Sequence, residues 1–226
     1  MSAVTARDEV LARVRAALAV PGSHHARTDG PEPTGGLAPP TGRTEILDLF
    51  EERVVDYRAS FERTARADLD TAVAAALTSR SVASVVVPQG LPESLTEAIA
   101  EAGVTVVTEE TVQSDGRPGP AALDALDGVV TTSSVGIATT GTIILDHSSG
   151  QGARALTLVP DLHVCIVDAD AVVTGVPEAV ARLRASVVAG RPLTWVSGPS
   201  ATSDIELERV EGVHGPRTLH VVLVVD

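Results

Sequence analysis

The sequence predicts an α/β protein in which helices cover both faces of a largely parallel sheet. Three observations lead to this fold class. First, 44% of the 226 residues are hydrophobic but only 2% are aromatic, so Val, Leu, Ile and Ala must fill the core. Second, valine-rich runs such as residues 82–87 and 219–225 suit strands that are buried on both faces. Third, these runs alternate with segments of helical periodicity, which is typical of parallel sheets.

The first 77 residues are expected to form helices joined by a linker. Apolar residues recur at helical spacing between residues 5 and 19, which predicts a short amphipathic helix. Residues 20–43 are so rich in Pro and Gly that little apolar area can offset the entropy of ordering them, which indicates a linker. Between residues 44 and 77, one long or once-broken helix is predicted by apolar residues at every third or fourth position: Leu47, Phe50, Val54, Tyr57 and Phe61.

The remaining chain alternates between strands and helices. Strands are expected at residues 82–87, 104–108, 128–131, 142–145, 164–167, 193–196 and 219–225, and helices at residues 92–102, 121–126 and 177–189. The sequence therefore predicts two regions, an N-terminal helix with its linker at residues 1–43 and an α/β domain at residues 44–226. In such a domain, ligands bind beyond the carboxyl ends of the strands.

Composition and charge exclude several classes of function. The formal charge of −13 at pH 7 opposes binding to nucleic acids and to anionic membrane surfaces, which require clustered basic side chains. Cys165 is the single cysteine, so the chain has no thiolate set for an iron–sulfur cluster and no partner for an internal disulfide. The histidines show no metal-ligand spacing, so no metal site is expected. Because no apolar run approaches about 20 residues and no signal-peptide pattern begins the chain, we expect a cytoplasmic protein.

A first candidate site is the uncharged segment TTSSVGIATTGT, residues 131–142, between two expected strands. Its glycines allow turns that expose consecutive amide N–H groups, and its hydroxyl groups add further donors. Such a segment could hold a carboxylate or a phosphate, unless its own backbone satisfies these groups. The candidate binding residues are Ser134, Gly136, Thr139, Thr140, Gly141 and Thr142.

A second candidate is the glycine-containing turn GQGARA, residues 150–155. The turn matches the G-x-G-x-x-A pattern of dinucleotide-binding units, but only residues 153–159 precede Pro160, too few for the crossover helix that such a unit requires. Two readings remain open. The turn either presents Arg154 to an anion or is a plain surface turn.

A third candidate is the segment from Ser197 to His220, in which Gly-Pro pairs make two rigid turns. Acids follow one expected strand, and histidines with an arginine precede the next, so an acid, a base and a guanidinium converge. This pattern predicts Glu206 and His214 as a catalytic acid–base pair, with a solvated loop as the alternative. The candidate binding residues in this segment are Ser197, Gly198, Ser200, Asp204 and Arg217.

Three blocks of the sequence resemble the LUD-domain, or lactate utilization protein C, family. The blocks are SVGIATTGTIILD, GARALTLVPDLHVCIV and SGPSATSDIELERVEGVHGPRTLHVVLV, and the resemblance extends over residues 44–226. The combination of SGPS-x-T-x-DIE with GVHGPR-x-LH carries most of the specificity. The resemblance implies a three-layer α/β/α fold with a mainly parallel sheet, similar to that of sugar-phosphate isomerases and CoA-transferases, preceded here by N-terminal helices.

The resemblance also implies a function, namely a role in the oxidation of L-lactate to pyruvate together with partner subunits that carry iron–sulfur clusters. Since this chain lacks the cysteines for a cluster, we expect no cofactor in it and place the clusters on the partner subunits. The chain would then be a non-redox subunit that binds a small carboxylate. One departure stands out: the family commonly has Glu in IAETGT, where this chain has Thr139.

Two further functions remain open from the sequence. One is a stand-alone ligase-like or transferase-like enzyme that uses Glu206 and His214 on an activated carboxylate or phosphate. The other is a non-catalytic assembly or regulatory factor. The valine-rich strand at the C-terminus leaves homo-oligomerisation open as well.

Overall fold

The computed structural model describes residues 6–18, 40, 42–114, 117–202, 210–211 and 215–226. The chain divides into two compact units, Met1–Ala38 and Pro39–Asp226. The first contributes helix α1 (Ala6–Leu18), as the periodicity predicts. All other described elements belong to the second unit. Among the helices that the structure describes, none combines the length and the apolar character needed to cross a bilayer.

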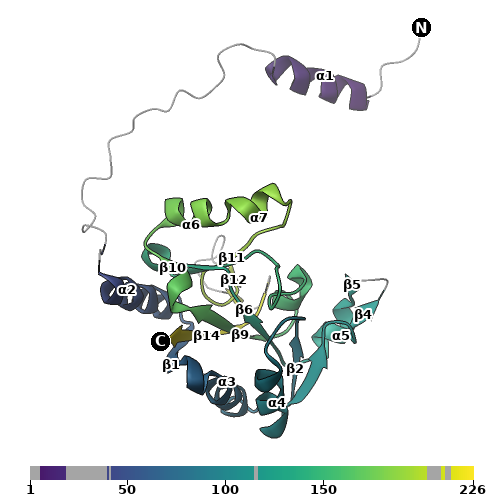
Figure 1. Ribbon diagram of the computed structural model, residues 1–226. Coiled ribbons are helices and arrows are strands. Elements are labelled where there is room, and N and C mark those ends of the chain that lie inside the picture. The colour runs from purple at the N-terminus through teal and green to yellow at the C-terminus, as the bar shows by residue number, and fades with distance from the viewer. Residues whose placement is uncertain (1–5, 19–39, 41, 115–116, 203–209, 212–214) are drawn as a thin grey trace. The chain divides into compact units, whose positions relative to one another are not determined.

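The second unit is built on a six-stranded sheet in which all neighbouring strands are parallel (Figure 1). The strand order is β1 (Ser60–Ala65), β14 (Thr218–Val225), β9 (Leu162–Asp168), β6 (Gly128–Thr132), β2 (Ser84–Val87) and β3 (Thr105–Thr108). Because the central strands are covered on both faces, they are apolar at nearly every position, as the uninterrupted runs predict. The mainly parallel α/β fold is therefore confirmed.

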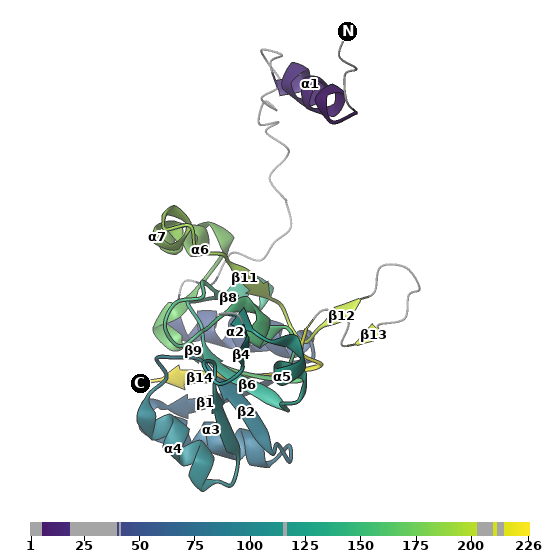
Figure 2. The same ribbon diagram turned by 90° about the vertical axis from the view of Figure 1, so that its right-hand side faces the viewer.

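The two faces of this sheet are covered differently (Figure 2). Helices α3 (Leu69–Thr78) and α4 (Glu93–Glu101) pack on one face. The other face packs against α2 (Arg43–Asp56), α5 (Pro120–Asp124) and part of a second sheet. The order of the second sheet is β10 (Val172–Val173), β7 (Val135–Ile137), β8 (Thr142–Leu145) and β11 (Thr194–Val196). Its outer face is covered by α6 (Val176–Arg182), which continues into α7 (Arg184–Val188).

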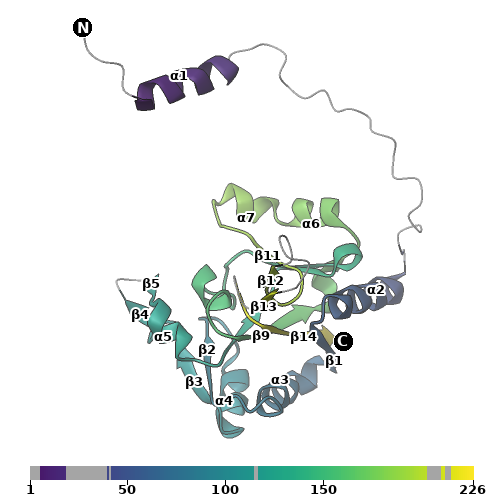
Figure 3. The same cartoon turned by 180° about the vertical axis from the view of Figure 1, so that it is seen from behind.

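Short elements complete the unit. They are two small hairpins, β4 (Gln113–Ser114) with β5 (Arg117–Pro118) and β12 (Ala201–Thr202) with β13 (Val210–Glu211), and four 3-10 turns, η1 (Arg66–Asp68), η2 (Ala138–Thr140), η3 (Arg154–Thr157) and η4 (Ala169–Ala171). Seen from behind, the β4–β5 hairpin and α5 lie on one flank, opposite α2 (Figure 3).

Two predicted helices are wrong in detail. The segment 44–77 is not one helix, because α2 ends at Asp56 and residues 60–65 form the edge strand β1 before α3 begins. Phe61 keeps apolar contacts, but from a strand whose pairing with β14 overrides the helical spacing. The helix predicted at 177–189 is split into α6 and α7 on either side of Leu183.

The segment 131–142 is predicted to be a connection between two strands, but it contains a strand of its own, β7, and the 3-10 turn η2. It completes β6, crosses to β7 and turns through η2 into β8. Its amides are used within the fold, since Ser134 N donates to Ile144 O at 2.9 Å and Thr139 N donates to Thr174 O at 3.1 Å. The glycines serve close packing. Gly136 faces the ring of Phe50, and a side chain on Gly141 (φ +57°) would collide with the backbone of Arg53.

A buried carboxylate fixes the loop that follows β8. Asp146 is 5% exposed and accepts hydrogen bonds from the hydroxyls of Ser134 (2.7 Å), Ser148 (2.6 Å) and Ser186 (2.5 Å). Arg191 adds an ion pair at 2.9 Å. Burial opposes the ionised form of Asp146, but these donors outweigh it and hold the pKa of the carboxyl well below its ordinary value.

Gln151 extends the same network toward η3. Its side-chain carbonyl accepts from the amides of Asp146 (2.7 Å) and His147 (3.2 Å), while its amide group donates to Ser134 and Ser148. Next along the chain, Ala153 N donates to Glu109 at 3.0 Å. Arg154 therefore begins η3 from a loop that these hydrogen bonds hold in place.

The Asp146 network predicts a pH-dependent loss of stability in Asp146→Asn. At pH 7 the variant should lose about 2–3 kcal/mol in free energy of unfolding, because one amide oxygen cannot accept from all the donors that surround the carboxylate. The folded pKa of Asp146 is depressed, so its contribution is present above the unfolded pKa of about 4 and is lost as pH falls below it. Chemical denaturation from pH 7 to pH 3 should show the difference from wild type shrinking with acidity.

Asp161→Asn is the matched control, because Asp161 pairs with Arg217 at 3.4 Å but both side chains are more than half exposed. This change should cost about 0.5 kcal/mol or less. Equal losses in the two variants at pH 7 would contradict the role given to Asp146.

Candidate functional site

A cavity of about 310 Å³ lies where the two sheets of the second unit meet. Its walls come from η3, from the first part of β9 and β14, and from the chain that runs out of β11, so it lies toward the amino ends of β9 and β14 and not beyond the carboxyl ends, where the sequence predicts the site. The lining residues are Arg154, Thr157, Leu158, His163, Thr194, Trp195, Val196, Ser197, Gly198, Pro199, Ser200, Gly215, Pro216 and Leu219. We call this cavity the inter-sheet cleft.

Among the described residues that line the cleft, Arg154 supplies the one guanidinium. The side chain is exposed, and within the described part of the chain it forms no ion pair or hydrogen bond. Other described arginines near carboxylates are paired, such as Arg217 with Asp161 and Arg191 with Asp146. An uncompensated guanidinium in a cleft is suited to bidentate recognition of a carboxylate or a phosphate.

The turn after β11 forms one side of the cleft. Ser200 N donates to Pro216 O at 2.8 Å, which ties this turn to the segment preceding β14. Ser197 Oγ lies 2.8 Å from Thr142 Oγ1, which in turn lies 2.7 Å from Thr140 Oγ1. Thr142 thus connects the hydroxyl-rich segment to the cleft through Ser197.

Gly198 is required by the packing of this turn. Its φ is +80°, and a Cβ there would lie 2.6 Å from Tyr57 Cβ and 2.8 Å from Tyr57 O. Only a residue without a side chain allows the turn to approach the end of α2 so closely.

A histidine forms part of the cleft wall. His163 lies on β9, is 1% exposed, and places Nε2 2.8 Å from Thr131 Oγ1. Burial lowers the pKa of His163 to about 4, so the ring is neutral at neutral pH. Cys165, on the same face of β9, is also buried, and burial raises the pKa of its thiol to about 12.

Of the residues predicted from sequence, four gather in the cleft: Arg154, Ser197, Gly198 and Ser200. Thr142 reaches it through Ser197. Ser134 instead belongs to the Asp146 network, and Gly136 and Gly141 lie in packed backbone. Thr139 and Thr140 line a separate cavity with Arg53, Asp56 and Tyr57.

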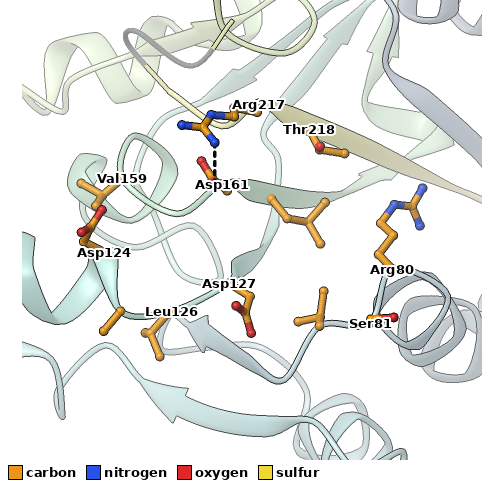
Figure 4. A pocket seen from close by; sticks show the side chains of 12 residues that line it. Arg80, Ser81, Asp124, Leu126, Asp127, Val159, Asp161, Arg217 and Thr218 are labelled. Atoms are coloured by element: carbon orange, nitrogen blue, oxygen red, sulfur yellow. Dashed lines mark ion pairs between the residues drawn. The ribbon is translucent and has the colours of Figure 1, made fainter.

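Arg217 does not face the inter-sheet cleft. It lines another cavity, of about 490 Å³, at the amino ends of the parallel strands (Figure 4). There it pairs with Asp161, across from Arg80 and Asp127. The predicted residues Asp204, Glu206 and His214 lie outside the described residues.

Sequence reasoning missed several cleft residues, chiefly Thr157, His163, Thr194 and Trp195. His163 and Thr194 sit within or at the end of strands, where they look like ordinary strand positions, and only the meeting of the two sheets makes them neighbours. Within the described ranges there is no group of three His, Cys, Asp or Glu side chains that could hold a metal ion.

The turn geometry predicts different costs for two glycine substitutions. Gly198→Ala should lower the free energy of unfolding by about 2–4 kcal/mol, since it combines left-handed strain with a collision against Tyr57. Gly103→Ala is the matched control, because Gly103 has a similar φ of +86° but nothing within 4 Å of the added Cβ. It should cost only about 1 kcal/mol. Equal costs in urea denaturation would show that Tyr57 does not constrain the turn.

Comparison with known proteins places the chain in a family. The family model of the LUD domain matches residues 121–224. A protein named lactate utilization protein C from Deinococcus radiodurans is 48% identical over 185 residues, which cover 82% of each chain. A protein of the same name from Shouchella clausii is 25% identical over 194 residues, which cover 81% of each.

A solved structure gives the same result. The crystal structure of a DUF162 family protein from Deinococcus radiodurans has a TM-score of 0.67 and 41% sequence identity to this chain, and covers 82% of this chain and 100% of its own. The chain therefore belongs to the LUD-domain family.

Proposed function

We propose that this chain is a non-redox subunit of an L-lactate utilisation system, in which it binds the small carboxylate substrate in the inter-sheet cleft. The observation that carries the proposal is the guanidinium of Arg154, which lines the cleft without a partner among the described residues. The relatives named lactate utilization protein C indicate the pathway in which such a site would act.

The chemistry of the cleft suits a small anion. Arg154 would pair with the carboxylate, and the Ser197 hydroxyl can serve as a further donor when it accepts from Thr142. Leu158 and Leu219 supply apolar wall for the rest of the molecule. Because the protein carries a net charge of −13, the local positive charge of Arg154 is what makes the cleft favourable for an anion.

Oxidation of lactate to pyruvate removes two electrons and two protons, so the substrate-binding chain needs an electron acceptor. Cys165 is buried with a protonated thiol and is the single cysteine, so this chain does not supply the thiolates of an iron–sulfur cluster. In this proposal the clusters belong to partner subunits, which accept the electrons.

The proposal predicts a specific loss in Arg154→Met. In a mixture of this chain with its partner subunits, lactate-dependent dye reduction should require about 10–100-fold more lactate for half-maximal rate, as expected for loss of a charge-assisted hydrogen-bonding pair. Arg184→Met is the matched control, because Arg184 is also exposed but lies on α7, away from the cleft. It should leave the lactate dependence unchanged.

The same assay separates the alternative functions. Equal dye reduction with and without this chain would contradict a substrate-binding role and favour an assembly or regulatory factor. Turnover of a carboxylate or phosphate substrate by the purified chain alone would favour a stand-alone enzyme instead.

A further inference from the structure

His163 is a buried titratable residue that packing alone does not account for. Its neighbours on the same face of β9, Cys165 and Val167, belong to an apolar cluster, whereas the imidazole lines the inter-sheet cleft. Nε2 is engaged with Thr131 at 2.8 Å. Nδ1 has no hydrogen-bond partner among the described residues.

His220, on the opposite face of the sheet, is the buried imidazole with which His163 can be compared. Its Nδ1 lies 2.8 Å from Ser60 Oγ and 3.1 Å from the Arg80 guanidinium, and its Nε2 is buried without a hydrogen-bond partner among the described residues. Each of the two rings thus has one nitrogen without a partner in the described part of the chain. His163 differs because its ring lines the inter-sheet cleft, where a ligand can supply the missing partner.

The hydrogen bond between Nε2 and Thr131 does not determine whether Nδ1 carries a proton. A neutral imidazole carries one proton, and Thr131 Oγ1 can either accept from Nε2–H or donate to a bare Nε2. When Thr131 Oγ1 accepts, its own hydrogen can be donated to Cys165 Sγ, which lies 3.9 Å from Oγ1. Both tautomers are thus satisfied on the Thr131 side, so Nδ1 can present either a donor or an acceptor to the cleft.

We propose that Nδ1 of His163 recognises the oxygen on C2 of a 2-hydroxy or 2-oxo carboxylate whose carboxylate group is held by Arg154. His163 is then the residue that distinguishes 2-oxygenated acids from simple carboxylates. This inference rests on the proposed carboxylate site. It goes beyond that site by naming the residue that recognises the C2 oxygen.

The arrangement explains how one site would hold both oxidation states. A ketone oxygen accepts hydrogen bonds only, so it requires Nδ1–H, while an alcohol is compatible with either tautomer. The low pKa keeps the ring neutral, and a neutral ring retains this choice, whereas an imidazolium would only donate. The cavity of about 310 Å³ is larger than a three-carbon acid needs. His163 therefore does not select the chain length of the bound acid, and other residues of the cleft wall would have to do so.

Calorimetric titration of the full-length protein with L-lactate, pyruvate and propionate tests the proposal. Propionate has the carboxylate but no C2 oxygen. We expect the wild type to bind lactate and pyruvate at least about tenfold more tightly than propionate, a difference of about 1.4 kcal/mol. Equal affinity for the three acids would overturn the role of His163 while leaving the carboxylate site intact.

Variants separate this inference from the proposed function. His163→Leu should reduce binding of lactate and pyruvate to the level of propionate, and His163→Asn, which keeps a polar group on a short side chain, should restore part of the difference. Arg154→Met should weaken the binding of all three acids by a similar factor. Failure of the wild type to bind any of the acids would overturn the proposed carboxylate site and this inference with it.

A spectroscopic measurement on the wild type tests the proposal without requiring that a variant bind the acids. Ring nitrogen shifts of ¹⁵N-histidine report the tautomer, and the His163 signals can be assigned by their absence in His163→Asn. Pyruvate should shift His163 to the Nδ1–H form, and propionate should leave its tautomer unchanged. A His163 spectrum that responds identically to both acids would contradict the proposal.

Discussion

The ionised carboxylate of Asp146 is the constraint on which the architecture of the site depends. It is almost fully buried, yet hydroxyls from the β7 hairpin, the following loop and α7, together with Arg191, compensate its charge. A buried charge is tolerated only when such donors surround it. Because Gln151 shares these donors, the same network determines the path of the chain up to Arg154.

The inter-sheet cleft exists because two sheets of different kinds meet. The parallel sheet supplies His163 and Leu219, and the second sheet, in which parallel and antiparallel pairs are mixed, supplies the chain that leaves β11. Rigid strands position the neutral imidazole, while a turn tied to Pro216 positions the serines. The cleft therefore combines a fixed wall with polar groups on short connections, an arrangement suited to a small polar ligand.

The departure from the family pattern at Thr139 takes on a different meaning in three dimensions. Thr139 lines the cavity beside Arg53, Asp56 and Tyr57 rather than the inter-sheet cleft. The lack of a carboxylate at this position thus removes no group from the cleft wall. Its connection to the cleft is indirect, through the hydroxyls of Thr140, Thr142 and Ser197.

The sequence by itself determined the buried strands, most of the helices and the family, because these follow from apolar periodicity and from contiguous motifs. Arg154, Ser197, Gly198 and Ser200 were also accessible, since glycine turns beside polar residues mark exposed connections. Only the tertiary structure decided that residues 60–65 form an edge strand, that a second sheet is present, and that His163 joins the cleft while Arg217 lies elsewhere. The physical reason is that strand pairing and sheet packing bring together residues far apart in the chain. The spacing of residues along the sequence does not reveal those contacts.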